Sequence, residues 1–141
     1  MKEINKDSLF NIFEENDEAV YKEYGLEEAL ESPCVKLGMV LEGLQNFQLL
    51  DLIQMKRSPR EYQRVKDTIQ AKYYIRLYNY LERIDINDLD DIKDLHECFH
   101  SEDILDGLNV LKNYFSKIEH YEKCGVIQKY QDTLIQVTIK D

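Results

Sequence analysis

Apolar residues recur every three or four positions along most of this 141-residue chain, a spacing that places them on one face of an α-helix. Such series predict long helices at about 33–56, 59–84 and 102–124, a short helix at about 88–99, and short helices within residues 1–31. We therefore predict an all-α, single-domain helical bundle over residues 1–141, with about five to seven helices, three of them long. The clearest series is Tyr62, Val65, Ile69, Tyr73, Leu77, Tyr80 and Ile84.

The two prolines of the chain mark helix starts. Ser32-Pro33 and Ser58-Pro59 each place a capping hydroxyl before a proline at the first helical position. Glu61 follows Ser58 at the spacing of a capping box. At the other end of a helix, Gly125 follows a lysine and a cysteine, and we expect it to terminate the helix at 102–124.

The sequence of the C-terminal segment 126–139 is compatible with two types of secondary structure. Ile127, Tyr130 and Leu134 have the spacing of a helix. Residues 135, 137 and 139, by contrast, are apolar in the alternating pattern of a strand. No other strand is evident that would pair with this one, so we expect a helix that frays after about Gln136.

The overall composition favours a protein of the cytoplasm. The formal net charge is −10, no run of about 18 apolar residues would span a membrane, and the first residues lack the apolar core of a secretion signal. Cys34, Cys98 and Cys124 are an odd number without a CxxC pair. We therefore expect three reduced thiols rather than a disulfide framework.

Positive charge is concentrated in one predicted helix. Residues 56–83 contain eight Lys/Arg and three acids, a net charge of +5, so the rest of the chain carries −15. A basic stripe with an interleaved tyrosine would hold phosphates and stack on a base, and this predicts a nucleic-acid-binding subunit as one alternative. The opposite interpretation is that these cations pair with acidic helices of the same bundle. The residues of the stripe are Arg57, Arg60, Arg64, Lys72 and Arg76.

Negative charge forms two blocks, and these carry the preferred functional hypothesis. Residues 1–32 contain ten acids and three lysines, and residues 84–111 contain nine acids and one lysine. A rigid acidic surface of this kind attracts a basic partner and speeds association. We therefore expect a small protein-interaction module, of the inhibitor or immunity/antagonist type, that occupies the basic surface of a partner protein. The steering acids are expected to be Glu14, Glu15, Asp17, Glu18, Asp90, Asp91 and Asp94.

Ten tyrosines and no tryptophan suggest where that interface is anchored. Residues 73, 74, 78 and 80 are all tyrosines, so they cover more than one face of a helix. We assign Tyr73 and Tyr80 to the core. Tyr74 and Tyr78 are expected to be exposed, because tyrosine is favoured at binding hot spots.

Signatures of catalysis and metal binding are weak. His96 and His100 lie one helical turn apart, with Glu97 and Cys98 between them, a spacing that is compatible with zinc. Two histidines still need further ligands, so we expect neither a metal nor another cofactor. The chain has no glycine-rich phosphate loop and no GxSxG sequence, and a non-enzyme is the preferred interpretation. The oligomeric state is left open by the sequence.

Overall fold

The computed structural model describes residues 31–140, which form five α-helices and no strand. The helices are α2 (Pro33–Arg57), α3 (Pro59–Glu82), α4 (Leu89–Cys98), α5 (Ser101–Lys117) and α6 (Tyr121–Lys140). The all-α prediction is therefore confirmed, and three predicted helices begin and end within two residues of α2, α3 and α4. The short helices expected within 1–31 fall almost wholly outside the described residues. None of the described helices has the length and apolarity that a membrane span requires.

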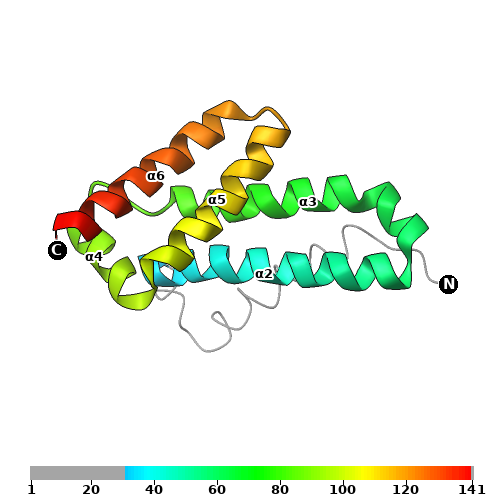
Figure 1. Ribbon diagram of the computed structural model, residues 1–141, viewed down its shortest axis with the longest axis horizontal. Helices are drawn as coiled ribbons and strands as arrows, with labels where there is room; N and C mark the ends of the chain where they lie inside the picture. Colours follow the sequence, from blue (N-terminus) through cyan, green and yellow to red (C-terminus); the bar gives the residue numbers. More distant parts are fainter. Residues whose placement is uncertain (1–30, 141) are drawn as a thin grey trace.

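Helices α2 and α3 form a long antiparallel hairpin (Figure 1). A single residue, Ser58, joins them. Its backbone N–H donates to the carbonyl oxygen of Gln54 (2.9 Å), and its carbonyl oxygen accepts from the backbone N–H of Tyr62 (2.9 Å). Ser58 thus ends one helix and starts the next, with Pro59 in the first turn of α3 as predicted. Its hydroxyl does not cap α3, so the predicted capping box does not form.

The α5–α6 hairpin crosses the α2–α3 hairpin obliquely (Figure 1). The predicted helix over 102–124 is wrong, because the chain turns at residues 118–120 and α6 starts at Tyr121. Glu119 has φ 63°, and the N–H groups of Glu119 and His120 donate to Ser116 (3.1 Å) and Phe115 (2.8 Å). These two bonds are those of a Schellman motif, which normally has glycine at the left-handed position. Gly125 lies within α6 and ends no helix.

The C-terminal segment is helical through Lys140, so the helix interpretation is confirmed, although the helix continues past Gln136, where fraying was expected. The reversal at Glu119 directs the apolar face of α6 into the core, where Ile127 and Leu134 are buried. Close packing of α2 on α3 is possible because Gly43 has no side chain. A Cβ built at Gly43 would come within 2.5 Å of Cδ2 of Leu77.

A disulfide joins Cys34 in the first turn of α2 to Cys98 at the end of α4, with 6.3 Å between their Cα atoms. The expectation of three reduced thiols is therefore wrong for two of them. The sequence conceals the pairing because 64 residues separate the two cysteines. Cys124 is free and half-buried, and its Sγ lies 3.5 Å from the carbonyl oxygen of Lys112.

Candidate functional site

The acidic residues of the second block gather around α4, at one end of the bundle (Figure 1). Asp88 precedes α4, and its side chain accepts hydrogen bonds from the N–H groups of Asp90 (3.0 Å) and Asp91 (3.3 Å). An aspartate at this position stabilises the helix start, and acids in the first turn suit the positive end of the helix dipole. Local helix chemistry thus explains why so many carboxylates stand together.

These carboxylates are open to solvent and repel one another. Asp90 and Asp94 are exposed, and Asp91 is half-buried. Partial burial and repulsion by neighbouring carboxylates raise the pKa of Asp91 above its ordinary value, and Lys36 opposes this rise. The neighbouring carboxylates that raise the pKa belong to Asp88, Asp94 and Asp85. We call residues 85–94 the acidic end.

The basic helix does not neutralise the acidic end. The ion pairs within residues 31–140 join Lys36 to Glu31 (3.7 Å) and Lys66 to Asp51 (3.1 Å). For the second block, the interpretation in which α3 cations pair with its acids is therefore wrong. Distance explains this for the cations near the α2–α3 turn, because α4 meets the first turn of α2 and these cations lie at the far end of α2, roughly 35 Å away at 1.5 Å per residue. Arg83 lies at the near end of α3, but its guanidinium lies over the Tyr80 ring, 5.5 Å from the centroid.

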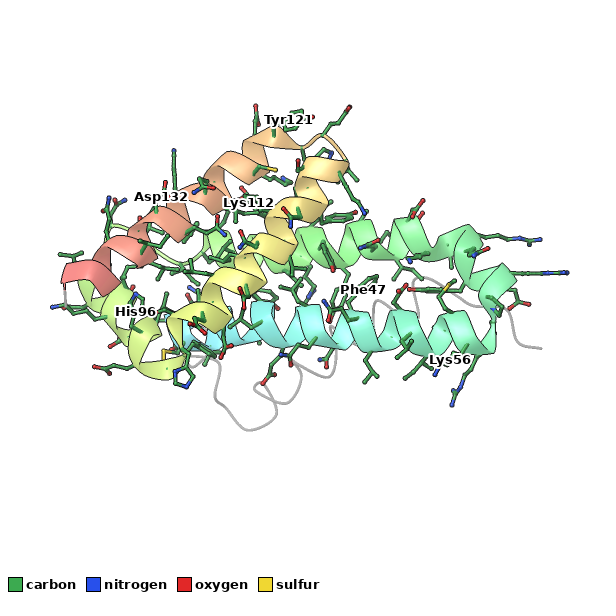
Figure 2. All side chains as sticks on the ribbon, viewed as in Figure 1. Phe47, Lys56, His96, Lys112, Tyr121 and Asp132 are labelled. Carbon is green, nitrogen blue, oxygen red and sulfur yellow. A yellow bond between two sulfur atoms is a disulfide. The ribbon has the colours of Figure 1, made fainter. Side chains whose placement is uncertain are left out.

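The predicted basic stripe divides into two parts. Arg57, Arg60 and Arg64 are exposed near the α2–α3 turn, and Figure 2 shows Lys56 there, at the opposite end of the molecule from His96. Further along α3, Arg76 donates to the hydroxyl of Tyr80 (2.9 Å) and lies over its ring. Lys72 also has an interaction partner.

Tyr74 and Tyr78 are buried, with 4% and 3% of their surface exposed, so the prediction that they are exposed is wrong. The oblique crossing of α5 covers the face of α3 that carries them. The Tyr74 ring packs against Tyr114, with 4.5 Å between the centroids, and the Tyr78 ring packs against Phe115 at 5.6 Å. Tyr73 and Tyr80 are buried, as predicted.

The other predicted site residues are the acids of the first block and the histidine pair. Glu14, Glu15, Asp17 and Glu18 lie outside the described residues. Nδ1 of His96 lies 3.2 Å from Oγ of Ser101, within hydrogen-bond distance. His100 is exposed, and Cys98 is in the disulfide. No group of three or more metal-ligating side chains occurs in the part of the chain that the structure describes.

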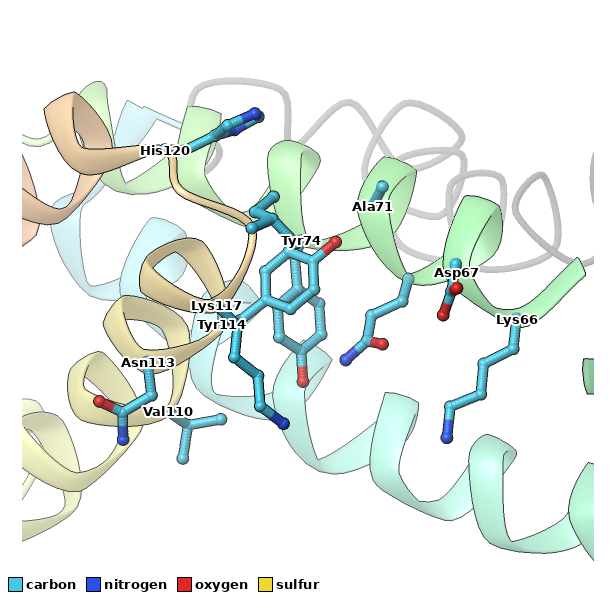
Figure 3. A pocket seen from close by; sticks show the side chains of 11 residues that line it. Lys66, Asp67, Ala71, Tyr74, Val110, Asn113, Tyr114, Lys117 and His120 are labelled. Carbon is cyan, nitrogen blue, oxygen red and sulfur yellow. The ribbon is translucent and has the colours of Figure 1, made fainter.

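Sequence reasoning missed a groove of about 830 Å³ between α3 and α5 (Figure 3). Ala71 and Tyr74 line it from α3, and Val110 and Tyr114 line it from α5. Lys66 and Lys117 flank it, but the ammonium of Lys66 is already paired with Asp51. No local sequence pattern announces the groove, because it exists only where two helices cross.

In comparisons with known proteins, no family model, no curated protein and no solved structure matches this chain.

Proposed function

We propose that this protein is a helical interaction module whose acidic end docks on a basic surface of a protein partner and thereby blocks or regulates that partner. The observation that carries the proposal is the exposure of Asp90 and Asp94 without an ion pair inside residues 31–140. If these carboxylates were paired with the arginines of α3, no acidic surface would remain for a partner protein to bind.

Electrostatics gives the docking a driving force. The pKa of Asp91 is raised first by partial burial and then by repulsion from the neighbouring carboxylates of the acidic end. A cationic partner relieves that repulsion on contact, and the field of such a cluster accelerates encounter by about 10- to 1,000-fold at low salt. Leu89 is 63% exposed among these acids and supplies apolar contact area.

The form of regulation that we favour is occupancy, in which a preformed acidic surface fills a groove that otherwise receives a polyanion. Inhibitors of the immunity or antagonist type work in this way. Occupancy requires no conformational change of the inhibitor, so a rigid helix is suitable for it. Ile92 and Leu95 hold α4 against the core, with 0% and 1% of their surface exposed.

The test compares partners captured from the native cell by three tagged forms. The wild type should capture a basic protein that the D90N/D91N/D94N variant fails to retain. The matched control is E42Q/E119Q/E122Q, which removes the same number of charges from exposed positions away from α4, and it should retain the partner. Equal capture by all three forms would exclude docking through the acidic end.

The exposed arginines near the α2–α3 turn favour a second candidate, nucleic-acid binding. Arg57, Arg60 and Arg64 would contact phosphates, but the burial of Tyr74 and Tyr78 removes the stacking part of the original hypothesis. Gel-shift titration with single-stranded and duplex RNA and DNA tests this candidate. Binding that falls with salt and disappears in R60E/R64E would support it, and no retardation at low salt would exclude it.

A further inference from the structure

The two sulfur atoms of the Cys34–Cys98 disulfide lie in different surroundings. Cys98 is exposed and is the last residue of α4. Cys34 is half-buried and is the second residue of α2, directly after Pro33. An incoming thiolate therefore meets Cys98 first, since access determines which sulfur of a disulfide is attacked.

The helix ends favour the same direction of attack. A thiolate is stabilised at a helix N-terminus, where backbone N–H groups lack partners, and is disfavoured at a C-terminus. Ser32 makes no side-chain cap at the start of α2, and the first turn contains no acid. The N–H groups of Cys34 and Val35 therefore have no capping carboxylate or hydroxyl from these residues. Cys34 is accordingly the better leaving group, and Cys98 is the poorer one.

We propose that Cys34–Cys98 is a reversible thiol–disulfide exchange site that accepts small thiols or an exposed dithiol reductant at Cys98. The thiolate of the reductant attacks Sγ of Cys98 and forms a mixed disulfide there. The Cys34–Cys98 bond breaks, and its electron pair goes to Sγ of Cys34. The second thiol of a dithiol, or another monothiol, then displaces Cys98. The reductant leaves as a disulfide, and two protein thiols remain after protonation from water.

The surroundings allow this exchange in the folded protein. Sγ of Cys34 lies 3.3 Å from the carbonyl oxygen of Asp94, which accepts a hydrogen bond from the Cys34 thiol once the departing thiolate has been protonated. This carbonyl favours the thiol over the thiolate and so opposes part of the effect of the helix end, whereas the greater exposure of Cys98 still directs the attack to that sulfur. Ile92 and Leu95 keep α4 packed on the bundle through buried contacts. Opening the bond therefore frees the end of α4 from the start of α2 without unfolding the core. This inference does not depend on the proposed function.

The direction of attack is tested by trapping the first step. Oxidised protein carrying C124S, which removes the third thiol, is mixed briefly with glutathione, acidified, and alkylated with N-ethylmaleimide. Trypsin separates the two sites, because Lys36 follows Cys34 whereas Lys93 and Lys112 enclose Cys98. We expect mass spectrometry to find glutathione on Cys98 in roughly fivefold excess over Cys34.

Two variants test the role of the helix end. S32D places a carboxylate where it competes with the Cys34 thiolate for the N–H groups of the first turn of α2, so we expect roughly twofold to fivefold slower exchange. S32A is the matched control and should exchange at the wild-type rate. A glutathione adduct mainly on Cys34, exchange only in denaturant, or free Cys34 and Cys98 thiols that oxidised glutathione fails to pair would each overturn the inference.

Discussion

The hydroxyl of Tyr130 in α6 donates a 2.6 Å hydrogen bond to the carbonyl oxygen of Ile84, just beyond the end of α3. The donor and the acceptor are 46 residues apart and buried. This bond satisfies a carbonyl that the end of α3 leaves without a helical partner. It therefore joins the α5–α6 hairpin to the α2–α3 hairpin at a defined position.

Removal of that hydroxyl should destabilise the protein. Y130F leaves a buried acceptor unsatisfied, and we expect the free energy of unfolding to fall by about 1–3 kcal/mol. Urea denaturation followed by circular dichroism measures the change. The control is Y121F, because Tyr121 is 65% exposed and its change should have little effect. Equal stability of Y130F and Y121F would mean that the bond contributes nothing.

Stability should also fall at alkaline pH. Burial, with smaller contributions from Glu82 and Asp85, raises the pKa of Tyr130 from 10.0 to about 12. Burial likewise raises the pKa of Tyr62, Tyr74, Tyr78 and Tyr114. A raised folded-state pKa favours the neutral phenol, so its contribution to stability is complete below about pH 10 and is lost as pH rises through about 12. Urea midpoints that stay constant across this interval would contradict the prediction.

A glycine at the left-handed turn should stabilise the protein. Glu119 adopts φ 63°, which costs a non-glycine residue about 1–2 kcal/mol. We expect E119G to raise the free energy of unfolding by about 1 kcal/mol. E122G makes the same chemical change within the first turn of α6 and should be neutral or destabilising. If E119G were less stable than the wild type, the Glu119 side chain would have to stabilise the protein by more than its left-handed backbone costs.

Reduction of the disulfide should lower the melting temperature. The bond closes a loop over a sequence separation of 64 residues, for which chain entropy gives a contribution of roughly 4 kcal/mol. We expect dithiothreitol and C34S to lower the melting temperature to the same extent. C124S should melt like the wild type in the absence of reductant. If the wild type melted at the same temperature with and without dithiothreitol, the disulfide would contribute nothing to stability.

The sequence predicted most of the helices because proline and serine mark their starts and apolar periodicity marks their buried faces. It missed the turn at Glu119, because a Schellman motif is recognised by its glycine and this one has a glutamate. It misassigned Tyr74 and Tyr78, because periodicity shows one apolar face of α3 and does not show that α5 packs over these tyrosines as well. The disulfide and the groove were missed for the same reason: both depend on how the helices pack in three dimensions.

The central claim is that carboxylates around α4 steer and hold a basic partner. The most direct measurement is the association rate with the captured partner as a function of salt, for wild type, D90N/D91N/D94N and E42Q/E119Q/E122Q. We predict that the α4 variant associates about 10- to 100-fold more slowly at low salt, that the control stays near the wild-type rate, and that the curves converge at high salt. Association rates that do not change with salt or with the α4 substitutions would contradict the claim.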